Sequence, residues 1–200
     1  MTMDDQTYRE RTEHVRQSYE KRKAAADKEK GLIMVFTGPG KGKSTAAFGM
    51  LLRALHHGMH CAVVQYVKGA IATGESEILQ RLGDRLEWHR MGQGFHWNTQ
   101  DRELDRAAAA AAWQKSLELM QRPDLGMLVL DEINVAVRLE QLALADVLDA
   151  LEKKPPMLHV VLTGRGAKPE LIERADLVTE MTMVKHPYRA GIKAQPGVEF

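Results

Sequence analysis

The sequence predicts an α/β fold in which a mainly parallel sheet is flanked by helices. From Gly31 onward, short apolar runs alternate with amphipathic helical patterns, and a glycine-rich loop joins the first run to the first helical pattern. Such alternation is typical of parallel strands joined by crossover helices. With 200 residues, 44% of them hydrophobic, the chain is long enough for one domain with a sizeable core and too short for two ordinary domains.

Apolar runs mark the expected strands. They are GLIMVFT, CAVVQYV, RLEWHRM, MLVLDE, HVVLTGR and LVTEMTMV. Amphipathic patterns between them mark the expected helices, the last of which begins at a proline that a first helical turn tolerates. These helices are Lys43–His57, Glu75–Leu82, Thr99–Gln121, Leu142–Lys154 and Pro169–Arg174.

Residues 1–30 have a different texture from the rest of the chain. They mix charges of both signs, and only Tyr8, Val15 and Tyr19 make a narrow apolar stripe at helical spacing. We expect this segment to be an N-terminal arm, either helical or disordered, followed by a single domain over residues 31–200.

Charge and cysteine content limit the functions to consider. Lys plus Arg number 28 and Asp plus Glu 27, which leaves a formal charge of +1. The chain therefore has no overall positive field that would attract nucleic acid or an anionic membrane. The single cysteine, Cys61, suits a reducing compartment. The N-terminus has no apolar run for a signal peptide, and no later segment is long enough to be a transmembrane helix. We therefore expect a soluble cytoplasmic protein that binds neither nucleic acid nor a membrane.

The stretch TGPGKGKST follows the first strand and opens the first helix, as a phosphate-binding loop does. Its glycines allow a tight turn whose N–H groups point inward, and the helix N-terminus adds a partial positive charge. Lys43 is expected to reach phosphate oxygens and Ser44 to coordinate Mg²⁺. Thr37 stands where the strict motif has its first glycine. The predicted ATP-binding residues are Gly38, Pro39, Gly40, Lys41, Gly42, Lys43, Ser44 and Thr45, with a solvated loop lysine as the alternative for Lys41.

Two later strands end in charged residues. The run MLVLDE ends in Asp131 and Glu132, and we expect Asp131 to hold the hydration shell of Mg²⁺. Glu132 is expected either to bind the metal or to orient an attacking water. Arg165 follows the fifth run, at the sheet edge where α/β folds bind ligands. It is expected to contact the nucleotide phosphates, with a solvated loop arginine as the alternative.

An aromatic cluster stands apart from this phosphate chemistry. The stretch GFHWNTQ places Phe95, His96 and Trp97 together in a chain with only 6% aromatic residues. Phenylalanine and tryptophan are most often core residues, and a ligand-facing role is the alternative.

Six separated motifs between Gly31 and Phe200 can be compared with known families: FTGPGKGKSTAAFG, VVQYVKG, GFHWNTQDRE, LVLDEINVAV, VVLTGRGA and KHPYRAGIKAQPGVEF. Taken together and in this order, they resemble the motifs of the corrinoid adenosyltransferases of adenosylcobalamin synthesis. The resemblance implies a RecA-like P-loop fold, a homodimer, and an electron-donating reductase such as a flavoprotein as a partner. The implied reaction transfers the 5′-deoxyadenosyl group of ATP to the cobalt(I) of a corrinoid and releases triphosphate.

The resemblance also implies roles for particular residues. Phe95 and Trp97 match a pair that lies against the lower face of the corrin and excludes an axial ligand, which makes cobalt(II) easier to reduce. His96 departs from the family pattern within this corrinoid-binding loop, and we expect it to point away from cobalt. Lys43 and Arg165, with Lys41, would stabilise the departing triphosphate. Glu132 would then serve the metal, because positioning a water would waste ATP.

Two other functions remain open at this point. A P-loop kinase or ATPase would need only the phosphate loop and LVLDE, and it leaves the aromatic cluster unexplained. A nucleotide-dependent switch or a RecA-like nucleic-acid-binding module is disfavoured by the near-zero charge and the lack of a basic stripe. The sequence does not identify the corrinoid acceptor, which could be cobalamin, cobinamide or an earlier intermediate.

Overall fold

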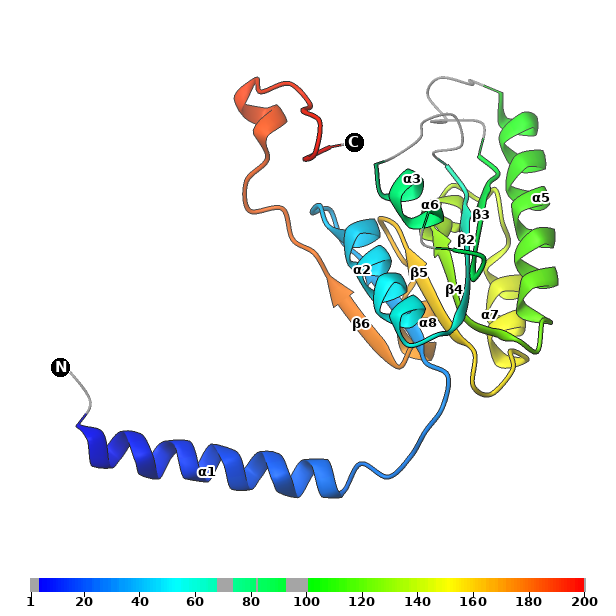
Figure 1. The fold of residues 1–200 in the computed structure, drawn as a ribbon. Helices are drawn as coiled ribbons and strands as arrows, with labels where there is room; N and C mark the ends of the chain where they lie inside the picture. The colour runs from blue at the N-terminus through cyan, green and yellow to red at the C-terminus, as the bar shows by residue number, and fades with distance from the viewer. Residues whose placement is uncertain (1–3, 68–73, 82, 93–100, 200) are drawn as a thin grey trace. The chain divides into compact units, whose positions relative to one another are not determined.

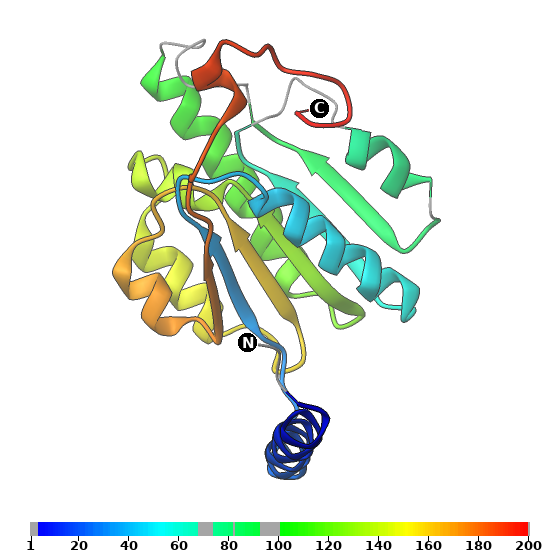
Figure 2. The ribbon, with the colours of Figure 1, turned by 90° about the vertical axis from the view of Figure 1, so that its left-hand side faces the viewer.

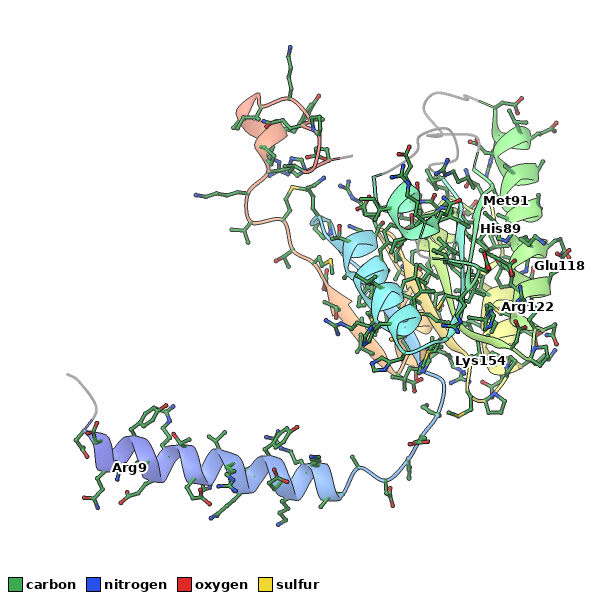
Figure 3. All side chains as sticks on the ribbon, viewed as in Figure 1. Arg9, His89, Met91, Glu118, Arg122 and Lys154 are labelled. Carbon is green, nitrogen blue, oxygen red and sulfur yellow. The ribbon has the colours of Figure 1, made fainter. Side chains whose placement is uncertain are left out.

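The computed structural model describes residues 4–67, 74–81, 83–92 and 101–199, in two compact units that divide between Lys30 and Gly31. The first unit contains helix α1, Asp5–Ala24, with none of its residues buried. Its side chains, Arg9 among them, project from the helix (Figure 3). Asp4 caps α1 by accepting hydrogen bonds from the N–H groups of Gln6 and Thr7. The arm is thus helical over this range.

The second unit is built on a sheet of six strands, all parallel, in the order β3-β2-β4-β5-β1-β6 (Figure 1). The strands are β1 Ile33–Thr37, β2 His60–Gln65, β3 Leu86–Arg90, β4 Leu125–Asp131, β5 His159–Thr163 and β6 Leu177–Glu180. All six expected apolar runs therefore form strands. The central ones are buried on both faces, which explains why they read as continuous apolar runs.

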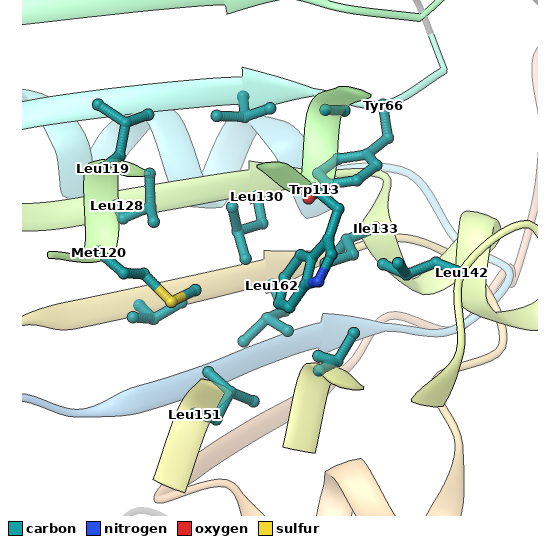
Figure 4. Packing of buried hydrophobic residues seen from close by; sticks show 14 of the residues in the cluster. Tyr66, Trp113, Leu119, Met120, Leu128, Leu130, Ile133, Leu142, Leu151 and Leu162 are labelled. Atoms are coloured by element: carbon teal, nitrogen blue, oxygen red, sulfur yellow. The ribbon is translucent and has the colours of Figure 1, made fainter. Parts of the chain in front are cut away.

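Helices cover both faces of this sheet, in three layers (Figures 1 and 2). Helices α2, Lys43–His56, and α3, Gly74–Gln80, pack against alternate strand residues such as Val63 and Val129. The other face packs against four helices: α5 Arg102–Met120, α6 Ile133–Arg138, α7 Leu144–Glu152 and α8 Pro169–Arg174. Figure 4 shows Trp113 of α5 in that core among Leu130, Ile133 and Leu162.

The helices also correct the expectations in detail. The expected helix Thr99–Gln121 begins at Arg102, because Asp101 is extended and caps the N–H groups of Glu103 and Leu104. Helix α6 was not anticipated, because it spans only six residues and its INVAV stretch is buried throughout, so it shows no helical alternation of polar and apolar residues. A short 3₁₀ helix, Pro187–Ala190, lies in the C-terminal segment.

The parallel strands place their carboxyl ends at one edge of the sheet. The phosphate loop leaves β1 there, Asp131 and Glu132 lie at the end of β4, and Arg165 follows β5. Strand β5 lies between β1 and β4, so the phosphate loop and the acidic pair come from strands that are not direct neighbours. The sheet order thus brings three separate sequence motifs to one edge.

Candidate functional site

The phosphate loop is held against the end of β6. Gly38 and Gly42 have φ values of 93° and 103°, a region that glycine adopts without the steric cost other residues meet. The N–H of Gly40 donates to the carbonyl of Met181 at 2.6 Å. A Cβ added to Gly38 would lie 2.5 Å from the same carbonyl oxygen. The loop therefore needs glycine both for its turn and for its close approach to the neighbouring backbone.

Lys43 begins helix α2 and is buried, with its ammonium group donating to the Gly40 carbonyl. The N-cap residue, Gly42, makes no side-chain cap to the first turn of α2. The N-terminal N–H groups of a helix lack partners within the helix and attract anions. A buried cation beside such a helix end suits a phosphate group.

Asp131 lies at the centre of a buried polar cluster. Its Oδ1 accepts hydrogen bonds from the hydroxyls of Ser44 and Thr163, both at 2.7 Å. Its Oδ2 accepts one from the side-chain amide of Gln65 at 3.0 Å. Only 1% of the Asp131 surface is exposed, so three donors compensate for its burial. Ser44 and Asp131, both predicted to serve Mg²⁺, are therefore in direct contact.

Glu132, the next residue, has a left-handed backbone with φ 64° and ψ 17°. This conformation is uncommon for residues other than glycine and is found often at functional sites. Its N–H donates to the Thr163 hydroxyl at 2.9 Å. A Cβ added to Gly164 would lie 3.1 Å from the Glu132 carboxylate, so this carboxylate lies beside the loop that follows β5.

That loop carries Arg165, whose side chain is exposed. Gly164 and Gly166 flank it with φ values of 125° and 72°. Three hydrogen bonds hold this loop. The Gly164 N–H donates to the Phe36 carbonyl at 3.1 Å, the Asn134 amide donates to the Gly164 carbonyl at 3.2 Å, and the Ala167 N–H donates to the Thr37 hydroxyl at 3.1 Å. The departure from the strict motif at Thr37 thus has a structural use, because a glycine there could not accept this bond.

The remaining predicted residues fall into two groups. Lys41 is exposed and ion-paired with Glu199 of the C-terminal segment. Pro39 and Thr45 are exposed as well. Phe95, His96 and Trp97 lie outside the described residues.

Sequence reasoning missed four polar residues of this site: Thr37, Gln65, Asn134 and Thr163. All four are buried, and three of them lie within or at the end of a strand. A polar residue within or at the end of an apolar run, such as Gln65 in CAVVQYV and Thr163 in HVVLTGR, is the signal that could have identified them.

The described residues contain no group of three or more His, Cys, Asp or Glu side chains that could hold a metal ion. Mg²⁺, however, is commonly bound by one or two protein oxygens together with substrate phosphates and waters. Ser44 and Asp131 present two such oxygens beside the phosphate loop. The site thus fits a metal that arrives with its nucleotide.

No helix in the described ranges has the length and apolar character needed to span a membrane.

Comparison with known proteins identifies close relatives. Residues 29–200 match the family ATP:corrinoid adenosyltransferase BtuR/CobO/CobP. Over 196 residues the chain is 50% identical to a corrinoid adenosyltransferase of Pseudomonas aeruginosa, covering 98% of this chain and 97% of the relative. It is 56% identical over 189 residues to one of Sinorhizobium sp, covering 90% and 88%. It is 42% identical over 198 residues to corrinoid adenosyltransferase CobA of Salmonella typhimurium, covering 99% and 100%.

Proposed function

The chain belongs to the ATP:corrinoid adenosyltransferase family, and we propose which of its residues carry out the reaction. The enzyme transfers the 5′-deoxyadenosyl group of ATP to the cobalt of a corrinoid. Cobalt(I) supplies the electron pair of the new cobalt–carbon bond, and the bond from C5′ to the triphosphate oxygen breaks with its electrons on oxygen. Because cobalt(I) is a strong nucleophile, the protein has two tasks, to align cobalt with C5′ and to stabilise the departing triphosphate.

The phosphate loop and Lys43 are proposed to bind the triphosphate. The observation that carries this proposal is the buried Lys43 ammonium group at the uncapped N-terminus of α2. Arg165 and Lys41 would add positive charge from the loop after β5 and from the phosphate loop itself. Arg165 is exposed and lies at the same sheet edge. Lys41 would have to leave its ion pair with Glu199 in order to bind phosphate.

Ser44, Asp131 and Glu132 are proposed to serve Mg²⁺. Hydroxyl and carboxylate oxygens are the hard ligands that Mg²⁺ prefers, and the Ser44 and Asp131 oxygens lie 2.7 Å apart. Bound there with ATP, Mg²⁺ would neutralise charge on the leaving triphosphate. The carboxylate of Glu132 lies toward Gly164, which suits an outer contact to the hydrated metal and offers no reason to assign it an attacking water.

Phe95 and Trp97 are proposed to cover the lower face of the corrin, with His96 between them turned away from cobalt. The described residues that precede this segment support the proposal. Met91 and Gly92 donate their N–H groups to the Gln65 carbonyl at 3.1 and 3.2 Å. The chain therefore leaves β3 at the sheet edge that carries Asp131.

A homodimer, a flavoprotein reductase as electron donor and a cytoplasmic location are also proposed. Tyr8, Val15 and Tyr19 on α1 are 59%, 59% and 56% exposed. An apolar stripe of this kind is typical of a contact surface, which supports a role of α1 in contacting a second copy.

The proposed function is tested by incubating the protein with ATP, Mg²⁺ and a chemically reduced corrinoid. We expect a light-sensitive cobalt–carbon product and, by phosphorus NMR, one intact triphosphate for each adenosylated corrinoid. ADP and phosphate without a cobalt–carbon product would instead assign an ATPase, with Glu132 as the residue that orients water.

The lysine assignment has its own variant. Lys43→Ala should lower kcat/KM for ATP by about one to two decades, because a charge-assisted hydrogen bond contributes about 1.5–3 kcal/mol. Lys153→Ala is the control. Lys153 is an exposed lysine that caps the C-terminal end of α7, and the chain continues from there to the start of β5, at the sheet edge opposite the phosphate loop. A folded Lys43→Ala protein with the kcat/KM of this control would refute the role of Lys43.

The aromatic assignment is tested with Phe95→Ala, Trp97→Ala. The double variant should still adenosylate a corrinoid supplied as cobalt(I), because alignment and leaving-group stabilisation remain. It should fail when supplied with cobalt(II) and a biological reductant, because the axial ligand is no longer excluded. If the two residues were core instead, truncation would cost about 3–5 kcal/mol of stability and impair both routes equally.

A further inference from the structure

We propose that Gln65 and Trp88 are positioning residues that hold the Asp131 carboxylate in the orientation needed for metal binding. The inference rests on the proposed metal role of Asp131. Neither residue is expected to touch ATP or corrinoid, and both act through the carboxylate.

The sheet register assembles this arrangement from neighbouring strands. Gln65 of β2 is directly opposite Asp131 of β4, and Trp88 of β3 is opposite Val63, two residues before Gln65. Residues of β2 that are two apart share a face, so Trp88, Gln65 and Asp131 lie on the face that α2 covers. The order β3-β2-β4 thus aligns an indole, an amide and a carboxylate.

Hydrogen bonds link these three side chains in one direction. The indole N–H of Trp88 donates to the Gln65 amide oxygen at 2.8 Å, and the Gln65 amide nitrogen donates to Asp131 Oδ2 at 3.0 Å. An indole can only donate, and an ionised carboxylate can only accept. Trp88 and Asp131 therefore each require the same orientation of the Gln65 amide. A reversed amide would place its NH₂ group against the indole N–H and its oxygen against the carboxylate.

Packing fixes the far end of this chain. The Trp88 ring lies against Phe48 of α2, with ring centroids 5.0 Å apart. Gln65 itself is only 1% exposed, so water does not compete for its amide. Phe48 and Ser44 are both on α2, and one helix therefore sets the position of the indole and supplies the hydroxyl that reaches Asp131.

The consequence for metal binding follows from how the two carboxylate oxygens are used. With Oδ2 held by Gln65, Oδ1 stays directed at Ser44, the proposed metal ligand. Residues that orient metal ligands in this way typically contribute 10–100-fold to metal affinity or activity, as an order of magnitude. Loss of the Gln65 donor would leave the carboxylate anchored through Oδ1 alone, by Ser44 and Thr163. The carboxylate could then turn about that oxygen, and Oδ2 would be buried without its partner.

The test measures the metal's contribution to nucleotide binding in the absence of corrinoid, so that no turnover occurs. Calorimetry gives the dissociation constant of ATP with EDTA and that of Mg·ATP, and their ratio is the readout. Gln65→Leu should lower this ratio by about 10- to 100-fold and leave metal-free ATP binding unchanged. Trp88→Phe keeps the ring and removes only the indole N–H, so the ratio should fall by about 2- to 12-fold, as for one neutral hydrogen bond.

The double variant gives a stricter test than either single variant. In a Gln65→Leu background, Trp88→Phe should have no further effect on the ratio, because its only route to Asp131 is gone. Trp113→Phe is the matched control, because it removes a buried tryptophan from the core on the opposite face of the sheet. Its ratio should equal that of the parent.

The outcomes separate this inference from the proposed function. If Asp131→Asn leaves the ratio unchanged, the metal role of Asp131 is wrong. If Asp131→Asn lowers the ratio while Gln65→Leu and Trp88→Phe do not, only the positioning role is wrong. If Gln65→Leu fails to fold, Trp88→Phe decides alone, and parental behaviour in that variant overturns the inference.

Discussion

Gly38→Ala is predicted to disrupt the phosphate loop while the rest of the second unit stays folded. At a φ of 93°, a Cβ costs about 1–2 kcal/mol. The new methyl group would also lie 2.5 Å from the Met181 carbonyl oxygen and 2.8 Å from its nitrogen, and overpacking of this kind costs about 1–3 kcal/mol. The total of about 2–5 kcal/mol is smaller than the 5–15 kcal/mol by which domains are usually stable.

The strain is expected to be relieved at the loop. Met181 accepts from the Gly40 N–H at 2.6 Å and donates to the Thr37 carbonyl at 2.9 Å. Moving Met181 away would break these bonds and turn the loop N–H groups from the phosphates. The expected loss is two hydrogen bonds from loop N–H groups to the phosphates, at about 1 kcal/mol each. Their sum exceeds 1.4 kcal/mol, which equals a factor of ten in affinity, so ATP binding should weaken by more than tenfold.

A matched control exists in the helix that follows. Gly49 is an exposed glycine in α2, and a Cβ there would meet nothing within 4 Å, so Gly49→Ala should stabilise the protein by about 0.5–1 kcal/mol. Urea unfolding and ATP calorimetry are measured on both variants. Equal stability and equal ATP affinity for Gly38→Ala and Gly49→Ala would refute this loop geometry.

Two further predictions concern charge. Burial, together with the Lys154 ammonium group, lowers the pKa of His159, whose Nδ1 accepts the Leu32 N–H at 3.1 Å. The unfolded chain therefore binds the proton more readily, so stability is full above the unfolded pKa of about 6.5 and falls as pH drops through it. Melting temperatures measured from pH 8 to 5.5 should show this loss, and His159→Gln should reduce it. If the melting temperature of His159→Gln depends on pH as steeply as that of the parent, the role of His159 is contradicted. Glu199→Gln should release Lys41 and tighten ATP binding a few-fold at low salt, with less than about 1 kcal/mol lost in stability. Calorimetry checks this, and weaker ATP binding would show that the Glu199 carboxylate supports the nucleotide site.

Local sequence predicted the elements because their signals are local. Strands β1, β4 and β5 are continuous apolar runs, and TGPGKGKST carries its three glycines and two lysines within nine residues. A loop of this kind needs only its own backbone and the following helix to make an anion site. Helix α6 was missed because its apolar residues are buried on more than one side, and a buried helix has no polar face to reveal its period.

The sequence by itself determined the alternation of strands and helices, the phosphate loop, the acidic end of β4 and, by resemblance, the adenosyltransferase family. Only the tertiary structure decided that β5 separates β1 from β4, that Thr37 ties the Arg165 loop to β1, and that Gln65 joins Trp88 to Asp131. These contacts link residues 23 to 130 positions apart in the chain. They depend on strand order and register, which side-chain periodicity along one segment does not specify, because pairing is a relation between segments.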